Sequence, residues 1–465
     1  MTQIMGKGLS TILGLFTIGM MTRYLGQTGF GQYTTIMAFL QLAGILADLG
    51  LSLVIVQMIS EHHEREEKII NNIFTFRFLT AVVLFIVAPM AALLFPFDPI
   101  IKTGIVVTAF SFLAMSLNQL IIGIFQKKLE MIKVAIAENL GRIVLLASVL
   151  YVIKHDLGLL AIMIAVTAGS LFNFATNFFF TRKWFRISFE YDREVWREIW
   201  RKSWPIGLSI IFNLFYFKAD TLILSLTQTQ ADTGIYGATY KVLEVLITLP
   251  FMFLGLMMPF ITTHWKKKNK VEFFGISQKA FDAMAMLAIP IVFGGYLLGV
   301  PVMTFVAGEE FVVSGRVLQI LSFAIAFIFL SNVFTHIVVA IDRQKEMMWG
   351  FLAVAMLALG GYFLLIPKFS YWGAAWMTVI AEGLIVAISA YVVHRYTTFR
   401  PHLRLVKKSL LSSLAMSVCI LVFHAYHLHV LFTITAATIV YFGTMYLVRG
   451  ISKDLILDIV PLRKQ

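Results

Sequence analysis

The sequence predicts an all-α polytopic membrane protein with about fourteen transmembrane helices in two pseudo-symmetric lobes. The chain of 465 residues is 59% hydrophobic and only 14% charged, with a mean hydropathy of +0.85, so it has too little polar surface to cover soluble domains of that length. Apolar runs of roughly 20 residues, the length that an α-helix needs to cross a bilayer, recur along the whole chain. The runs are continuous rather than alternating, which favours helices over barrel strands.

Charged residues or Gly and Pro breaks end each apolar run and divide the chain into successive spans. The first run continues to Arg23 without a small-residue cleavage site, which indicates a retained first span rather than a signal peptide. Twelve spans is the alternative count, because the run at 100–126 can begin later and the final two runs are closely spaced. In order, the expected spans are 3–22, 32–58, 71–95, 100–126, 132–153, 157–181, 204–227, 234–262, 273–306, 316–341, 346–366, 372–396, 407–425 and 428–448.

Lysine and arginine residues outside the spans fall almost entirely in alternate loops. One set of loops carries 27 of them and the other set carries five. Under the positive-inside rule the richer set is cytoplasmic, so both termini are expected inside and the number of spans is even. The formal net charge of +13 therefore belongs to cytoplasmic loops beside the lipid bilayer, and we expect no nucleic-acid partner.

The longest break between spans, RKWFRISFEYDREVWREIWRKS at 182–203, lies near mid-chain. Its aromatic residues interleave with arginine and acidic residues, as in an amphipathic helix on the inner membrane surface. We interpret it as a linker between halves, with a partner-docking helix as the alternative. The expected organisation is an N-terminal lobe at 1–181, the cytoplasmic linker at 182–203, a C-terminal lobe at 204–396, and the final two helices with a cytoplasmic tail at 397–465.

A weak internal repeat supports two related halves. The segment LGQTGFGQYTTIMAFLQLAGIL (25–46) and the segment TQTQADTGIYGATYKVLEVLITL (227–249) each contain a short external turn with Gly and Tyr, followed by a span. An offset of 203 residues superposes Gly31 on Gly234 and Tyr33 on Tyr236. Together with the mid-chain linker, this repeat predicts two facing bundles of about seven helices each.

Charged residues inside the spans are candidate functional residues, because a charge at the bilayer centre costs several kcal/mol. Lys218 and Asp220 are two residues apart, so they point to different faces of one helix and each needs a partner or a hydrated cavity. Asp48 is either a cavity charge or the cap of a broken helix. The charged residues in spans are Lys7, Arg77, Arg142, Lys218, Lys241 and Lys279, with Asp48, Glu138, Asp220, Glu244, Asp282 and Glu382.

Some of these charges have an opposite partner one helical turn away. Each such pair can neutralise itself within its own helix or contribute charge to a cavity, and the sequence leaves both readings open. The pairs are Glu138 with Arg142, Lys241 with Glu244, and Lys279 with Asp282.

Two basic residues, Lys7 and Arg23, bracket the first expected span. A cation near each end of a cavity-lining helix can hold an anionic head group, since Lys and Arg bind phosphate where water is excluded. Alternatively, Arg23 anchors the helix at the external interface together with Tyr24.

Patterns that would indicate an enzyme or a metalloprotein are missing from the sequence. It contains no phosphate loop, nucleophile elbow, HExxH pattern or dinucleotide fingerprint, so we expect no catalytic residues and no bound cofactor. The external connections are too short for a folded catalytic domain. The single Cys419 cannot form an intramolecular disulfide. His424, His427 and His429 cluster at a helix end, where an interfacial turn is favoured over a metal site.

Two blocks of the sequence resemble bacterial polysaccharide flippases, the exporters of undecaprenyl-diphosphate-linked repeat units for O-antigen, capsule or exopolysaccharide. The remaining spans match only in pattern and length. The first block contains Thr22-Arg23-Tyr24-Leu25-Gly26, the turn with Gly29, Gly31 and Tyr33, and Asp48-Leu49-Gly50; the second contains Lys218-Ala219-Asp220, Thr233-Gly234-Ile235-Tyr236 and Lys241.

The resemblance implies the multidrug/oligosaccharidyl-lipid/polysaccharide exporter fold, with two lobes, a central cationic cavity and alternating access. It also implies a location in the bacterial inner membrane and a lipid-linked oligosaccharide as the substrate. The implied energy source is a proton gradient, a sodium gradient or the membrane potential. The implied protein partners are a glycan polymerase and a chain-length regulator. The cations that it assigns to the substrate diphosphate are Lys7, Arg23, Lys218 and Lys241; further coupling or cavity charges are Asp48, Asp220, Glu138, Arg142 and Glu244. Some relatives have Arg where this chain has Lys, which gives a point charge in place of a bidentate fork.

Two other functions remain open at this point. A multidrug and toxin extrusion antiporter shares the implied fold but expels organic cations, and the even balance of span charges does not separate it from a flippase. A membrane glycan polymerase or ligase is disfavoured by the short external loops.

Overall fold

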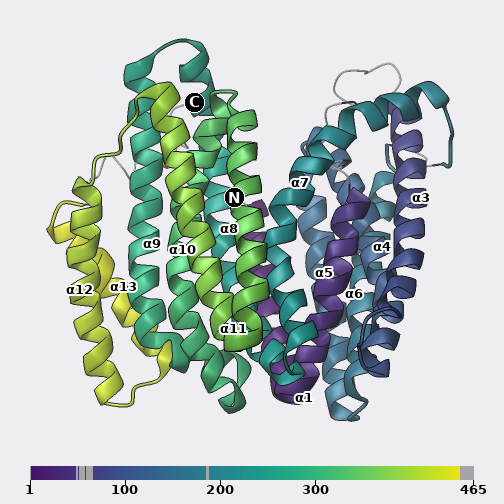
Figure 1. The fold of residues 1–465 in the computed structure, drawn as a ribbon, viewed down its shortest axis with the longest axis horizontal. Helices are drawn as coiled ribbons and strands as arrows, with labels where there is room; N and C mark the ends of the chain where they lie inside the picture. Colours follow the sequence, from purple (N-terminus) through teal and green to yellow (C-terminus); the bar gives the residue numbers. More distant parts are fainter. Residues whose placement is uncertain (1, 49–50, 52–57, 59–65, 185–187, 451–465) are drawn as a thin grey trace. The chain divides into compact units, whose positions relative to one another are not determined.

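The computed structural model describes residues 2–48, 51, 58, 66–184 and 188–450. Every regular element in these ranges is a helix, which confirms the all-α class, and ten of the helices are long and apolar enough to cross a membrane (Figure 1). The helices are α1 (Thr2–Asp48), α3 (Glu66–Ala92), α4 (Pro99–Lys127), α5 (Met131–Lys154), α6 (Gly158–Thr181), α7 (Arg193–Thr227), α8 (Gln230–Lys266), α9 (Lys270–Ala307), η2 (Glu309–Phe311), α10 (Val312–Ala340), α11 (Gln344–Thr397), α12 (Arg404–Ala425) and α13 (Val430–Leu447).

Two of the helices contain a backbone break where the sequence predicts a turn between spans. In α1 the break is at Gly26, whose φ of 62° lies in the region that glycine adopts without steric cost. In α11 it is at Ser370, with φ of 50°, three residues after Pro367, which removes a helical hydrogen bond. The breaks separate the expected spans 3–22 from 32–58 and 346–366 from 372–396. The count of fourteen stays a prediction.

The two arms of α1 run in opposite directions. Along the first arm, from Gly6 to Gly14, the neighbouring residues of α5 have rising residue numbers, so the arm runs parallel to α5. Along the second arm, from Ile36 to Gly44, the neighbouring residues of α4 also have rising residue numbers, so this arm runs parallel to α4. Because α4 and α5 are antiparallel across the short turn that joins them, the Gly26 break reverses the chain (Figure 1).

The chain divides into two compact units. Unit 1 comprises Met1–Ala238 and Leu359–Tyr371, and unit 2 comprises Thr239–Ala358 and Trp372–Gln465. The division falls inside α8, and α7 already begins at Arg193, so the second half of the expected linker forms the first turns of the helix that contains the expected span 204–227. The lobe limits of the sequence analysis stay predictions.

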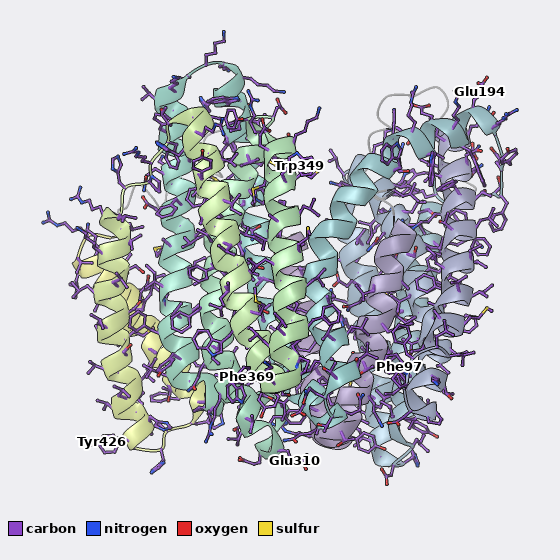
Figure 2. The ribbon with its side chains drawn as sticks, in the orientation of Figure 1. Phe97, Glu194, Glu310, Trp349, Phe369 and Tyr426 are labelled. Atoms are coloured by element: carbon purple, nitrogen blue, oxygen red, sulfur yellow. The ribbon has the colours of Figure 1, made fainter. Side chains whose placement is uncertain are left out.

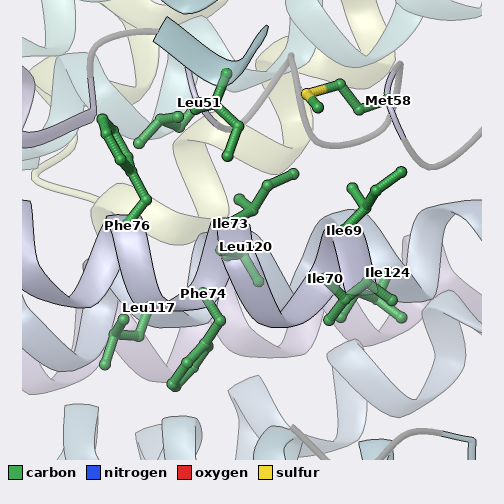
Figure 3. Packing of buried hydrophobic residues seen from close by; sticks show 11 residues of the cluster. Leu51, Met58, Ile69, Ile70, Ile73, Phe74, Phe76, Leu117, Leu120 and Ile124 are labelled. Atoms are coloured by element: carbon green, nitrogen blue, oxygen red, sulfur yellow. The ribbon is translucent and has the colours of Figure 1, made fainter. Parts of the chain in front are cut away.

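A buried apolar cluster holds the start of α7 against α3 and α4. Ile73 of α3 lies near its centre (Figure 3), and Ile199 of α7 is one of its fully buried members. Such packing in a lipid-facing bundle excludes lipid and fixes the helices through close contact. The buried members are Leu51, Met58, Ile69, Ile70, Ile73, Phe74, Phe76, Leu117, Leu120, Ile124 and Ile199.

The segment just before α7 is bonded to the first turns of α3. The backbone N–H of Glu190 donates to Thr75 Oγ1 at 2.9 Å, and that of Asp192 donates to Asn72 Oδ1 at 2.6 Å. Asp192 then caps α7, because its Oδ1 accepts from the N–H groups of Glu194 and Val195. We call residues 188–192 the strap; it fixes where α7 begins.

Candidate functional site

A lysine–glutamate pair joins the first arm of α1 to α5. Lys7 Nζ lies 2.9 Å from Glu138 Oε1, and Ser10 Oγ donates to the same oxygen at 2.8 Å. Asn139 Nδ2 donates to the Gly6 carbonyl at 3.0 Å, which holds the two backbones close together. The Lys7 side chain is 47% exposed, so its ammonium group keeps donors for a further anion.

Arg142 lies one turn further along α5 and packs over Gly14 of α1. A Cβ atom at Gly14 would be 3.5 Å from the Arg142 guanidinium carbon, so this small residue leaves the guanidinium room beside the helix. Of the two readings left open for Glu138 and Arg142, the structure does not show the ion pair within α5, because Glu138 pairs with Lys7. That partner lies 131 residues away in the sequence, where helical spacing gives no signal.

These contacts define the α1–α5 seam as Lys7, Ser10, Glu138 and Arg142. The seam holds two cations against one carboxylate, so it carries a net positive charge. It brings together three of the residues that the sequence singled out, from two separate helices. Such a site can hold an anion that has more than one charged oxygen.

Asp220 of α7 is fully buried and hydrogen-bonded. Its Oδ2 accepts from the Tyr236 hydroxyl at 2.7 Å, and its Oδ1 accepts from the Thr221 N–H at 2.6 Å. The bond to Tyr236 joins α7 to the start of α8. Lys218, two residues before Asp220, is half-buried. The functional roles assigned to these two residues stay predictions.

Unit 2 contains one further charged pair and one carboxylate that is bonded to an amide. Lys241 Nζ is 3.0 Å from Glu244 Oε2 within α8, so this pair neutralises itself in place as its spacing allows. Asp282 of α9 accepts a hydrogen bond from Gln278 Nε2 at 2.9 Å.

Arg23 lies at the end of the first arm of α1, and Asp48 lies at the end of the second arm. Arg23 is exposed three residues before the Gly26 break. Its neighbour Tyr24 donates to Asp156 Oδ1 at 2.9 Å and accepts from the Gly158 N–H at 2.8 Å, which ties this end of α1 to the α5–α6 turn. Asp48 is the last residue of α1, and its side chain lies outside the described part of the structure.

Two glycines from the internal repeat pack against each other. A Cβ atom at Gly31 would overlap the Gln230 carbonyl oxygen, and a Cβ atom at Gly234 would overlap the Gln27 carbonyl oxygen. The offset of 203 residues maps Gln27 onto Gln230 and Gly31 onto Gly234, so the two contacts are reciprocal. Reciprocal contacts between equivalent residues indicate a local two-fold axis. We call this contact the glycine crossing.

The crossing is tied to the break in α11 by one side chain. Gln228, which ends α7, donates from Nε2 to the Ile366 carbonyl at 3.1 Å and to the Pro367 carbonyl at 3.3 Å. These carbonyls lie just before Ser370, where the helical bonding pattern is interrupted. The α7–α8 turn therefore supplies hydrogen-bond donors to carbonyl groups that lose their helical partners at the break.

Polar pairs that the sequence analysis did not assign hold α3, α4 and α6 together. The buried Arg77 donates to Gln119 Oε1 at 3.2 Å, and Asn177 Nδ2 donates to Asn118 Oδ1 at 2.9 Å. In a membrane, such side-chain bonds stabilise helix contacts that the hydrophobic effect does not. Their signal in the sequence is polar residues inside apolar runs.

The histidine cluster lies beside a cavity of about 580 Å³ in unit 2. His424 and His429 line the cavity, and so does Glu309, which is distant from them in the sequence. His429 Nδ1 accepts from the Leu431 N–H at 3.3 Å and so caps α13. Among the described residues, no group of three or more potential metal ligands comes together.

Comparisons with known proteins agree with this architecture. The family model described as "Polysaccharide biosynthesis protein" matches residues 2–265, a range that includes the α1–α5 seam and the glycine crossing. The chain is 21% identical over 299 residues to "Capsular polysaccharide biosynthesis protein CapF" of Staphylococcus aureus, covering 63% of this chain and 74% of that protein.

Similar solved structures are those of transporters. One described as "Lipid II flippase MurJ, inward closed conformation" has a TM-score of 0.82 at 16% identity, covering 98% of this chain and 99% of the other. An inward-facing multidrug resistance MATE family transporter of the MOP superfamily has a TM-score of 0.64 at 12% identity, covering 84% and 94%. At these identities the similarity shows the fold alone, which this chain shares with these transporters.

Proposed function

The chain belongs to the polysaccharide biosynthesis protein family, and on that premise we propose that it is a flippase. Its proposed cargo is an undecaprenyl-diphosphate-linked oligosaccharide repeat unit, moved from the cytoplasmic to the outer leaflet. The observation that carries this proposal is the positive charge of the α1–α5 seam, where Lys7 and Arg142 face a single carboxylate.

A lipid-linked oligosaccharide presents a diphosphate between a sugar and a polyprenyl tail. The tail can stay in lipid, whereas the diphosphate needs fixed cations to replace its hydration. Lys7 supplies a mobile ammonium and Arg142 a planar fork on neighbouring helices, which suits two adjacent phosphates. Lys218, Lys241 and Arg23 are further proposed contacts on the substrate path.

Transport by alternating access needs one end of the path closed while the other is open. The glycine crossing lies in the predicted external turns, and its backbone-to-backbone approach leaves no room for a substrate between the helices. We therefore assign the crossing to the closed outer end. The proposed drive is a proton gradient, a sodium gradient or the membrane potential, with Asp220 and Glu138 as coupling candidates.

The proposed setting is the bacterial inner membrane, with both termini cytoplasmic. Because the cargo is a repeat unit, a glycan polymerase and a chain-length regulator are the expected partners on the outer side.

Binding of a fluorescent undecaprenyl-diphosphate-linked oligosaccharide to the purified protein tests the seam. Lys7→Gln and Arg142→Gln should each weaken binding about tenfold, the loss of one charge-assisted hydrogen bond. The matched control is Lys154→Gln, an exposed lysine at the other end of α5, which should bind like the wild type. Unchanged affinity in both seam variants would remove the seam as the diphosphate site.

A cation antiporter is the second candidate, because the chain also shares its fold with MATE transporters. Such a protein should move organic cations and ignore the lipid-linked substrate. Uptake of a fluorescent organic cation by vesicles that contain the protein would favour the antiporter, whereas translocation of the lipid favours the flippase.

A further inference from the structure

The first three turns of α7 expose one face that combines arginines and tryptophans. Residues four, seven, eight and eleven positions after Arg193 lie on the same side of an α-helix as Arg193 itself. All five are exposed, and Trp200 and Trp204 are 53% and 50% exposed. We call this set the α7 face: Arg193, Arg197, Trp200, Arg201 and Trp204.

The opposite side of the same turns is buried. Ile199 is fully buried in the apolar cluster with α3 and α4, and Val195 and Trp196 pack against that cluster. The strap and the Asp192 cap fix where these turns begin. The orientation of the α7 face is therefore set by packing on its other side, and its residues are not free to turn inward.

The charges of the α7 face are uncompensated within the described part of the chain. None of its three arginines has an ion pair or a hydrogen bond to a described residue, whereas Lys202 on another side is paired with Glu198 at 2.8 Å. Two acidic residues are adjacent to the face in the sequence: Glu194, labelled in Figure 2, and Glu198, which is paired with Lys202.

We propose that the α7 face binds the phosphate groups of anionic phospholipids in the membrane leaflet beside it. Guanidinium groups bind phosphate through paired hydrogen bonds, and tryptophan rings settle at the level of the lipid headgroups. The helix continues from these residues into the expected span 204–227, so this face is expected to meet the headgroup layer rather than bulk water. The lipid contact would hold α7 at a fixed depth, independently of the cargo that the protein carries.

Quenching of tryptophan fluorescence by brominated lipids tests the proposal on the full-length protein in vesicles. Brominated phosphatidylglycerol and brominated phosphatidylcholine are compared at equal mole fraction, and the Trp200→Phe/Trp204→Phe variant isolates the signal from the face. The anionic lipid should quench this signal more strongly. A basic side chain strengthens binding to an anionic surface roughly fivefold, so the variant Arg193→Gln/Arg197→Gln/Arg201→Gln should lose the preference. High salt should weaken the preference of the wild-type protein for the anionic lipid.

The control removes an equal charge from another exposed basic cluster, as Lys266→Gln/Lys267→Gln/Lys268→Gln, and should keep the preference. Melting temperatures of both variants should match the wild type, because the changed side chains are exposed. Equal quenching by both lipids in the wild type would overturn the proposal, and so would a preference that survives the arginine changes. Quenching of Trp200 and Trp204 by aqueous iodide as strong in vesicles as in detergent would also overturn it, since the face would then be open to water and to a soluble partner.

Discussion

Glu138 holds the Lys7 ammonium at 2.9 Å, so any anionic head group that binds Lys7 must compete with this carboxylate. A transporter needs such competition, because a site with no competing internal anion binds its anionic cargo tightly and releases it slowly. The exposed position of Lys7 keeps the pair weak, as expected for an ion pair in contact with solvent. At the scale of single residues, Glu138 would therefore return Lys7 to its resting state in the proposed transport cycle.

Glu138→Gln should tighten binding of the lipid-linked oligosaccharide and slow its release. Glutamine keeps the shape and one hydrogen-bond acceptor for Lys7 and Ser10 but removes the competing charge. We expect affinity to rise by about threefold to tenfold, equivalent to roughly 1 kcal/mol for a partly exposed pair. The control is Glu130→Gln, whose carboxylate pairs with Lys133 at the start of the same helix. Weaker binding in Glu138→Gln would contradict the competition.

Tyr236→Phe should lower the stability of the protein. The buried Asp220 carboxylate would lose the hydroxyl that donates to its Oδ2, at a cost of about 1–3 kcal/mol. Thermal unfolding in detergent should show a melting temperature lower by a few degrees. Tyr446→Phe, at a tyrosine that is 60% exposed, is the matched control. Equal melting temperatures for the two variants would count against a structural role for the Asp220–Tyr236 bond.

At the scale of helices, two contacts set the geometry of unit 1. The glycine crossing fixes the start of α8 against the second arm of α1, and the strap fixes the start of α7 against α3. The crossing depends on the close approach of two backbones, and the strap depends on backbone N–H groups that donate to side chains of α3. They lie at opposite ends of α7, so each can be perturbed separately (Figure 1).

Gly31→Ala and Gly234→Ala should each disrupt the crossing. The added methyl group would overlap a backbone carbonyl of the other helix, which cannot move aside as a flexible side chain can. We expect a destabilisation of about 1–3 kcal/mol and a loss of transport. Gly255→Ala, in α8 but with open space around it, should unfold no earlier than the wild type, because alanine favours a helix over glycine. Full transport by both crossing variants would show that the contact is not needed.

The strap should weaken at low pH. The hydrogen bond from Lys68, and then that from the Val195 N–H, hold the pKa of Asp192 below its usual value. A carboxyl with a lowered pKa stabilises the folded state above its unfolded pKa, about 3.9, and loses this effect as the pH falls through its folded pKa. The protection of the Glu194 and Val195 N–H groups from hydrogen exchange, taken relative to the intrinsic exchange rate at each pH, should therefore fall below about pH 4. Asp192→Asn should remove this dependence; a dependence that persists would place its origin elsewhere.

At the scale of the whole molecule, the sequence predicts membrane spans well because bilayer thickness fixes their length. The expected span 132–153 and helix α5, Met131–Lys154, differ by one residue at each end. The linker was less predictable, since α7 runs without a break from the expected linker into the expected span 204–227 and no composition change marks its start at Arg193. A backbone cap at Asp192 determines that start.

The sequence predicts which residues belong to the candidate site but not which of them contact one another. Charges inside apolar runs pointed to Lys7, Glu138 and Arg142, while their pairing depends on how α1 packs on α5. The internal repeat aligned Gly31 with Gly234, yet alignment alone does not place two segments in contact. Contacts between distant segments follow from tertiary packing, which local spacing does not encode.

Translocation in reconstituted vesicles tests the central claim most directly. The purified protein is placed in vesicles with a fluorescent undecaprenyl-diphosphate-linked oligosaccharide, and a membrane-impermeant reagent reports the fraction of label on the outer surface over time. We predict that the protein makes label from the inner leaflet accessible without chemical change to the lipid, and that Lys7→Gln/Arg142→Gln slows this while Lys154→Gln does not. Label that stays protected with the wild-type protein, or a glycan that is lengthened or transferred, would contradict the account.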